Sequence, residues 1–333
     1  EEEVDALMGT FASESTQTIL PFTAQEGIPL IVTGSAAPTT VTDFIGQDYE
    51  RYKNFFRTGP INSIHQARGF AGYADYLSAR HDWNTFGFVA DRASWTTPYN
   101  ETLVSLLEDG GYNVPYSERI SIETDNYSPI LNNVLDAEVD ALFNFFAHQT
   151  AGAMYGEWAQ RRLPFGIEGI NVWSQMPSWF QQTQGAAIFT TTSQSGAGGA
   201  APVTPRTLPF VEAYREQFGE AETPPRGHPM YMGFNTYDAL HFYRQAVEQA
   251  GTWDYENFLD DIVNAMLSTT FTGTTQEISL EGPDGEFPHD VIPEEDASGA
   301  LALSITQWQM EGALECVYPQ SYNTADHLAP TWM

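Results

Sequence analysis

One pattern, a short apolar run followed by a loop of small residues, occurs twice in the first forty or so residues. The apolar runs are residues 6–8 and 28–32. Ser13 or Ser15 can cap a helix between them, and Gly27 can close it. This order predicts two parallel strands whose following loops meet at one edge of a sheet, which is where open α/β folds bind ligands. A helix N-terminus at that edge favours a carboxylate or another anion.

The same alternation continues through most of the chain. Residues 85–90 and 141–146 predict buried strands, and residues 64–80 predict a helix because their apolar side chains recur at helical spacing. Strands that alternate with helices of about ten residues indicate parallel sheets with right-handed crossovers. We expect further strands at 55–58, 113–122 and 186–190, helices at 99–109, 128–135, 151–162, 209–219 and 236–251, a linker at 191–205, and a closing hairpin from 301–308 and 314–318.

The chain is strongly acidic and almost free of lysine. It has 44 acidic and 13 basic residues among 333, a formal charge of −31, and Lys53 is the only lysine. The acidic residues are scattered, which is typical of a protein surface in very salty surroundings, where screening over about 3 Å at 1 M salt suppresses self-repulsion. Binding to nucleic acid or to an anionic membrane is disfavoured, since both need clustered Lys and Arg.

Catalytic and metal-binding patterns are weak. The single cysteine, Cys316, excludes an internal disulfide and every cysteine-based metal cluster. No nucleophile elbow, phosphate loop or paired histidines at ligand spacing occur, and the acidic residues of 284–296 do not follow the order of an EF-hand. We therefore predict no enzyme, no catalytic residue, no cofactor and no metal. No apolar run reaches the 18 or so residues that a membrane span needs.

Several motifs in order resemble the type I solute-binding proteins of ABC transporters, specifically the leucine/isoleucine/valine-binding group. The match covers nearly the whole chain, and about eight motifs together carry it. They are residues 5–9, 13–17, 27–31, 34–38, 56–58, 88–91 with Trp95, 166–169, 236–240, 307–309 and 317–319. Residues 166–169 match the family's Gly-x-Glu-Gly turn.

This resemblance implies an α/β fold of two doubly wound lobes, joined by three hinge crossovers, with the ligand held between the lobes. The crossovers are expected at 58–60, at 190–192 and between 285 and 301. The N-lobe would comprise residues 1–59 and 192–290, and the C-lobe residues 60–191 and 298–333. Relatives carry further residues before the position of Asp5, so we expect the N-lobe to lack its first strand and helix and the sequence to be a fragment or a late start.

In the N-lobe, the resemblance assigns four residues to the ligand. Ser13 matches a serine that holds the ligand carboxylate; a plain helix cap is the alternative. Gly34 and Ser35 belong to a second loop whose backbone touches the ligand. There Ala36 replaces a threonine of the amino-acid binders, which removes one hydroxyl and weakens the case for an identical ligand.

In the C-lobe, the resemblance assigns an acid and an aromatic residue. Glu168 matches the acid that pairs with the ligand ammonium; a solvated surface glutamate is the alternative. Trp95 matches an aromatic residue that covers the ligand; a core aromatic is the alternative. Three other residues lie near family pocket positions, although packing alone can explain them: His148, Tyr231 and Met232.

These expectations together favour an extracellular receptor that closes on a branched-chain amino acid and delivers it to an ABC permease. The alternative is the same fold binding amides, urea or aromatic and carboxylic acids, or serving as a ligand sensor. We expect a monomer at the cell surface, with a lipid anchor if the preceding residues carry one. An enzyme on this scaffold is the least favoured reading.

Overall fold

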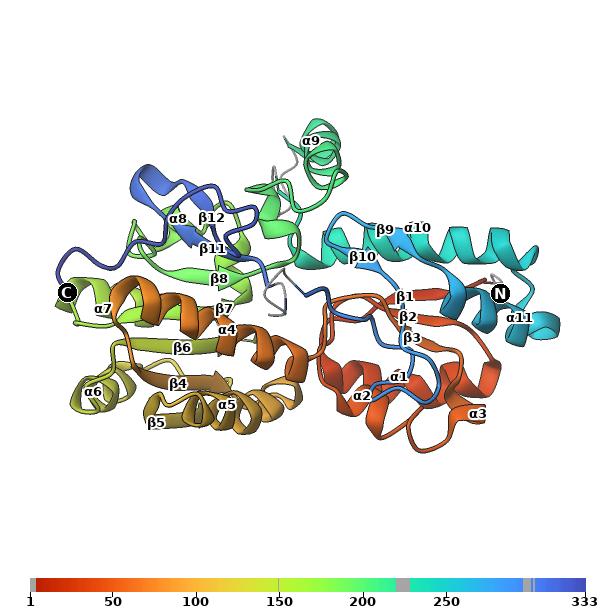
Figure 1. Cartoon of the computed structure of the whole chain (residues 1–333), viewed down its shortest axis with the longest axis horizontal. Helices are drawn as coiled ribbons and strands as arrows, with labels where there is room; N and C mark the ends of the chain where they lie inside the picture. Colours follow the sequence, from red (N-terminus) through yellow and green to blue (C-terminus); the bar gives the residue numbers. More distant parts are fainter. Residues whose placement is uncertain (1–3, 149, 220–227, 296–300, 302) are drawn as a thin grey trace.

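The computed structural model describes residues 4–148, 150–219, 228–295, 301 and 303–333, which form two αβ lobes side by side (Figure 1). The chain passes between the lobes three times, after β3 (Phe55–Arg57), after β8 (Thr191–Ser193), and between β10 (Glu277–Ile278) and β11 (Ile305–Trp308). The predicted architecture of two lobes and three crossovers is therefore present.

The N-lobe is built on a parallel sheet in the order β1-β2-β3. Helices α1 to α3 cover one face and α10 and α11 lie on the other, beside the small β9–β10 hairpin (Figure 1). The bounds are β1 Leu7–Gly9, α1 Ser13–Glu26, β2 Leu30–Val32, α2 Thr39–Thr42, α3 Tyr49–Tyr52, β3 Phe55–Arg57, α9 Thr207–Phe218, α10 Tyr231–Ala250, α11 Tyr255–Ser268, β9 Phe271–Thr272 and β10 Glu277–Ile278.

The C-lobe contains a parallel sheet in the order β5-β4-β6-β7, beside an antiparallel sheet in the order β12-β11-β8. The bounds are α4 Ser63–His81, β4 Thr85–Asp91, η1 Ser94–Thr96, η2 Tyr99–Leu103, α5 Val104–Asp109, β5 Asn113–Ile120, α6 Ser128–Asp136, β6 Ala141–Phe146, α7 Gly152–Arg161, β7 Gly166–Asn171, η3 Val172–Gln175, α8 Trp179–Gln182, β8 Thr191–Ser193, β11 Ile305–Trp308, η5 Met310–Gly312 and β12 Leu314–Tyr318. The short helix η4 Ser195–Gly199 follows the second crossover.

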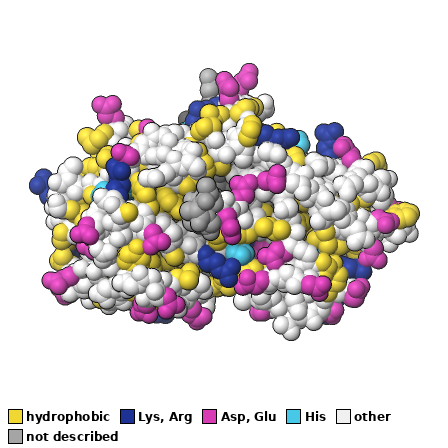
Figure 2. Space-filling model, in the orientation of Figure 1, with side chains coloured by type: hydrophobic (Ala, Val, Ile, Leu, Met, Phe, Trp, Pro, Cys, Tyr) yellow, Lys and Arg dark blue, Asp and Glu magenta, His cyan; other side chains and the backbone are white. Residues whose placement is uncertain are grey.

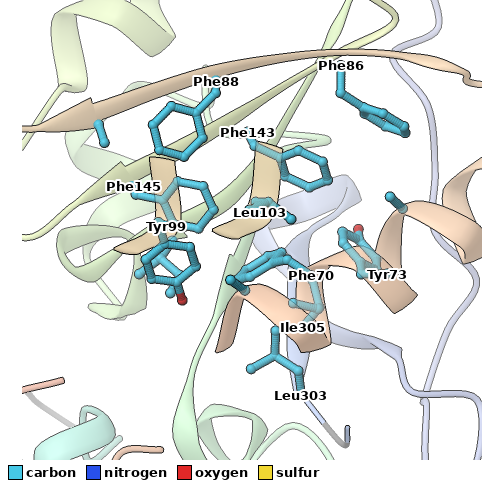
Figure 3. Packing of buried hydrophobic residues seen from close by; sticks show 14 of the residues in the cluster. Phe70, Tyr73, Phe86, Phe88, Tyr99, Leu103, Phe143, Phe145, Leu303 and Ile305 are labelled. Carbon is cyan, nitrogen blue, oxygen red and sulfur yellow. The ribbon is translucent and has the colours of Figure 1, made fainter. Parts of the chain in front are cut away.

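Aromatic residues of helix α4, of η2 and of strand β6 pack against one another in the core of the C-lobe. Phe143 and Phe145 alternate along β6 and point to the same face, as strand geometry requires. Phe70 of α4 meets Phe145 edge-on at 5.2 Å between ring centroids, and Tyr99 stacks on the same ring at 4.2 Å (Figure 3). Leu303, which follows the third crossover, lies below Phe70 in this view and packs in the same core (Figure 3).

Three local predictions from the sequence were wrong. Residues 186–190 form turns, and the strand is β8, which pairs with β11 in the C-lobe, so the chain leaves that lobe after Ser193. Residues 166–169 lie in strand β7 and do not form a turn. Helix α1 takes Ala12 as its N-cap, which places Ser13 inside the first turn, and the helix continues through Pro21.

The single cysteine lies in the interior of the C-lobe. Cys316 of β12 is fully buried and packs with Ala197 and Ala201, which follow the second crossover. Burial raises the pKa of its thiol to about 12. The thiol is free, in agreement with the sequence, whose single cysteine excludes an internal disulfide.

Candidate functional site

A cavity of about 130 Å³ lies between the lobes. Loops that follow β1 and β2 line it from the N-lobe, and loops that follow β4, β6 and β7 line it from the C-lobe. These are the carboxyl ends of parallel strands, as expected for a ligand site in an open α/β sheet. The lining residues used below are Phe11, Ser13, Gly34, Ala36, Thr58, Trp95, His148, Ile170, Val172, Gln175, Gln194, Tyr231 and Leu303.

The first N-lobe loop brings the N-terminal turn of α1 to the cavity. Ser13 is buried, and its hydroxyl accepts a hydrogen bond from the amide N–H of Ala37 at 3.1 Å. This bond ties the first loop to the second. Because α1 is 14 residues long, its N-terminus presents amide N–H groups and a positive dipole end to the cavity.

The second loop, residues 34–37, gives all its carbonyl oxygens to the protein. Each accepts a hydrogen bond from a side chain or backbone group that belongs to another part of the fold. The donors are the Tyr231 hydroxyl to Gly34, Arg57 Nη1 to Ser35 and Ala37, and the Ser63 amide and hydroxyl to Ala36, at 2.8 to 3.3 Å.

Most amide N–H groups of the same loop have no hydrogen-bond acceptor in the described part of the chain. Among the described residues, no acceptor takes the N–H of Gly34, Ser35 or Ala36. Buried backbone N–H groups are nearly always paired in folded proteins. Gly34 and Ala36 line the cavity, so this loop is a donor surface that a bound anion or water can satisfy.

The C-lobe wall carries Trp95 and His148. Asp91, the last residue of β4, is fully buried, and its Oδ2 accepts the amide N–H groups of Ala147 and His148, both at 2.9 Å. This carboxylate fixes the loop that carries His148. Burial raises the pKa of Asp91, while the two N–H donors oppose that shift. The His148 ring meets Phe11 of the opposite lobe edge-on at 5.9 Å between centroids.

A second contact crosses the cleft beside the cavity. Glu14 of α1 accepts the amide N–H of Ser94 with its Oε1 at 2.8 Å. Burial raises the pKa of Glu14, but the hydrogen bonds from Ser94 and from its own amide outweigh that effect and lower the pKa overall. The two lobes therefore touch at Phe11 and at Glu14, on either side of the start of α1.

Glu168 does not line the cavity, which corrects the position expected for the ligand acid. Its side chain is fully buried in the C-lobe. The hydroxyls of Tyr73 and Thr191 donate to its Oε2 at 2.8 and 2.6 Å, and the His327 ring meets its Oε1 at 3.1 Å. Protein donors thus occupy both carboxylate oxygens, and we do not propose Glu168 as the ammonium partner.

Two other predicted residues lie behind the cavity wall. Ser35 is buried, and its hydroxyl accepts a hydrogen bond from Thr16 at 2.8 Å. Met232 packs against Gly34. Ser13, Gly34, Ala36, Trp95, His148 and Tyr231 do line the cavity.

Several lining residues were missed by the sequence analysis. Gln175 accepts the amide N–H of Tyr231 at 3.3 Å and donates to the carbonyl of Ser193 at 3.2 Å. Gln194 lies in the segment predicted to be a linker, where four successive residues, Gly196 to Gly199, adopt positive φ. The run of Ser, Gly and Gln there was the available signal, because such residues suit tight backbone next to a ligand.

The wall is nearly free of charge. His148 is the one histidine that lines the cavity within the described ranges, and no Asp, Glu, Lys or Arg from those ranges lines it. Thr58, Trp95 and Gln194 each hold a buried polar side-chain atom for which the described residues supply no partner. The described chain also contains no group of three His, Cys, Asp or Glu residues arranged to hold a metal ion.

A family model described as periplasmic binding protein matches residues 1–293. The chain belongs to that family. Its members are the non-enzymatic solute-binding components of ABC transporters. No curated protein matches the chain significantly in sequence. Among the residues that the structure describes, no helix is both long and apolar enough to cross a bilayer.

Solved binding proteins share the fold at low sequence identity. A putative branched-chain amino acid ABC transporter protein of Silicibacter pomeroyi is 15% identical, with a TM-score of 0.80 over 99% of this chain and 82% of that one. A leucine binding protein of Thermotoga maritima is 17% identical, with a TM-score of 0.72 over 94% and 79%. A Rhodopseudomonas palustris solute binding protein in complex with 3,4-dihydroxybenzoic acid is 18% identical, with a TM-score of 0.70 over 98% and 80%.

Proposed function

We propose that this binding protein captures a small carboxylate that lacks an ammonium group, such as an aromatic acid, and delivers it as a monomer to an ABC permease. The amide donor loop at residues 34–36 carries the proposal, because its carbonyl oxygens are occupied while its N–H groups remain available. A ligand carboxylate beside Ser13 would accept those N–H groups and the α1 dipole.

The rest of the cavity suits an apolar or aromatic body. Trp95, Ile170, Val172 and Leu303 supply apolar cover, and Phe11 adds a ring from the N-lobe. The unpaired indole N–H of Trp95 can donate to a hydroxyl or carbonyl on the ligand. Closure over such a ligand removes water from the carboxylate and its donors, which strengthens each hydrogen bond.

A branched-chain amino acid is the second candidate, since the apolar wall also fits an aliphatic side chain. Its ammonium, however, would face a wall to which the described residues contribute no carboxylate. Burying an unpaired ammonium costs several kcal/mol. The position of Glu168, fully buried among its own donors, is the feature that places this candidate second.

Calorimetric titration with 3,4-dihydroxybenzoate and with leucine tests the proposal. We expect saturable 1:1 binding of the acid and no binding of leucine. Ser13→Ala should lower the affinity for the acid by about tenfold or more, since a hydrogen bond to a charged group contributes about 1.5–3 kcal/mol. The matched control is Ser15→Ala, an exposed serine of the same helical turn. Leucine binding in the absence of acid binding would reverse the order of the two candidates.

A further inference from the structure

Arg57, the last residue of β3, is a fully buried cation paired with a fully buried anion. Its Nε and Nη2 donate to the two carboxylate oxygens of Asp290 at 2.6 and 2.5 Å. This two-pronged geometry is the one in which an arginine and a carboxylate bind most strongly. Neither side chain contacts solvent, so each depends on the other for its charge to be tolerated.

The remaining guanidinium nitrogen of Arg57 contacts the second N-lobe loop, which contains the amide donor loop of residues 34–36. Nη1 donates to the carbonyl oxygens of Ser35 and Ala37 at 3.3 and 3.0 Å, and to the Thr40 hydroxyl at 3.2 Å. A peptide group that turns its carbonyl toward Arg57 turns the next N–H the other way, because the peptide unit is planar and trans. The Ser35 carbonyl and the Ala36 N–H belong to one such peptide.

Asp290 connects this pair to the hinge. It lies in the N-lobe before the third crossover, and its backbone bridges to Arg57 in β3. Its Oδ2 also accepts the side-chain N–H of Asn62 at 2.9 Å. Asn62 follows the first crossover and caps α4, since its Oδ1 accepts the amides of Ile64 and His65. One carboxylate therefore contacts both the last residue of β3 and the residue that caps α4 after the first crossover.

We propose that Arg57 is a positioning residue for ligand binding, and that the Arg57–Asp290–Asn62 cluster couples the donor loop to hinge closure. This inference rests on the proposed function only in the choice of a carboxylate as the probe. Arg57 holds the Ser35 carbonyl away from the cavity, so the N–H of Ala36, which belongs to the same peptide, faces it. When the lobes rotate about the crossovers, Asn62 moves with the C-lobe, and its hydrogen bond to Asp290 transmits that motion to Arg57 and the loop.

The first experiment compares an acid with its neutral amide. We measure the affinities of the wild-type protein and of Arg57→Lys for 3,4-dihydroxybenzoate and 3,4-dihydroxybenzamide. A lysine keeps the charge but cannot serve the carboxylate and two carbonyls together. We expect the preference for acid over amide to fall at least tenfold. An equal loss for both probes would mean that Arg57 only supports the fold, and would overturn the proposal.

Two further variants separate the effect of Arg57 on ligand preference from a loss of folding. Arg68→Lys alters an arginine that pairs with Glu286 at the surface, and it should leave the acid preference unchanged. If Arg57→Lys does not fold, the double variant Arg57→Met with Asp290→Leu replaces the buried pair by apolar side chains, an exchange that folds often tolerate. It should show the same selective loss, and an unchanged acid preference in it would overturn the proposal.

The second experiment needs no ligand. Spin labels at cysteines introduced for the exposed residues Gln25 and Asn133 report the distance between the lobes, because exposed thiols are labelled well before the buried Cys316. Asn62→Ser keeps a capping hydroxyl but loses the amide N–H to Asp290. We expect a broader distance distribution than in the wild type, and the same for Arg57→Lys.

Exposed Asn264→Ser is the control for this second experiment and should leave the distribution unchanged. A wild-type distribution in Asn62→Ser and Arg57→Lys would overturn the hinge role. If the wild type binds neither 3,4-dihydroxybenzoate nor leucine, the proposed ligand class fails, while these distances still decide whether the Arg57–Asp290–Asn62 cluster controls closure.

Discussion

At the scale of single residues, Gly34 shows how little space the donor loop has. A Cβ added to Gly34 would lie 2.4 Å from the carbonyl oxygen of Thr10 and 2.9 Å from Cε of Met232. The first of these neighbours is backbone and cannot turn aside. The close approach of the β1 and β2 loops therefore requires a residue without a side chain.

We expect Gly34→Ala to lower the free energy of unfolding by about 1–3 kcal/mol, the usual cost of overpacking, and to weaken ligand binding through the displaced loop. Urea denaturation and titration measure the two effects. Gly156→Ala in helix α7 is the control: no neighbouring atom lies within 4 Å of its added Cβ, so it should be neutral or raise stability by up to about 1 kcal/mol. Equal stabilities for the two variants would contradict this account.

The sequence located the loops of the site but could not assign every side chain. Ser13, Gly34 and Ala36 were found because small residues after a strand are a local signal. Glu168 was misplaced, because its partner His327 lies 159 residues further along the chain. Arg57 was noted only as part of a strand. A basic residue inside an apolar strand of an acidic chain was the signal that it is buried with a partner.

At the scale of secondary elements, the C-terminal segment after β12 is joined to helix α4 through a buried chain of polar groups. His327 contacts Glu168 on one side and the His81 ring on the other, at 3.1 and 2.8 Å. Arg80 donates to the His327 carbonyl and pairs with Asp326. These contacts hold the tail against the C-lobe.

This arrangement predicts a pH dependence of stability. Burial, and then the neighbouring His327, lower the pKa of His81 from 6.5 to about 4. The unfolded chain therefore binds a proton at His81 more readily, so the free energy of unfolding should fall as the pH drops from about 6.5 to about 4. His81→Asn, which keeps a donor but does not titrate, should show a smaller fall. Denaturation at several pH values measures this, and parallel profiles below pH 6.5 would contradict it.

Element boundaries were predictable wherever the apolar period was clear. Helix α7 and strand β6 lie within two residues of their predicted bounds. The apolar run at 186–190 misled because Ala187 and Phe189 are buried in the C-lobe core from turns. Periodicity detects burial, and a short buried turn and a short buried strand look alike to it.

At the scale of the whole molecule, charge is the dominant property. Acidic side chains are spread over the visible face of both lobes, with few basic ones between them (Figure 2). With a formal charge of −31, the compact state is opposed by repulsion among its own carboxylates. Salt shortens the range of that repulsion from about 10 Å at 0.1 M to about 3 Å at 1 M.

We therefore expect the melting temperature to rise as KCl increases from about 0.1 M to about 1 M, with most of the rise at the low end, where screening changes most. Differential scanning calorimetry measures it, and NaCl should act like KCl because the effect depends on ionic strength. A melting temperature that does not depend on salt would mean that the surface carboxylates are compensated within the fold.

The buried thiol of Cys316 makes the opening rate of this part of the receptor measurable. A thiol reagent reacts with the thiolate at a solvent-accessible sulfur, and this sulfur has no exposure and a pKa of about 12. Strand β12, which carries it, pairs with β11, and β11 pairs with the strand that leads into the second crossover. The labelling rate of the native protein therefore counts how often this part of the C-lobe opens, and a ligand that locks the lobes together should slow it.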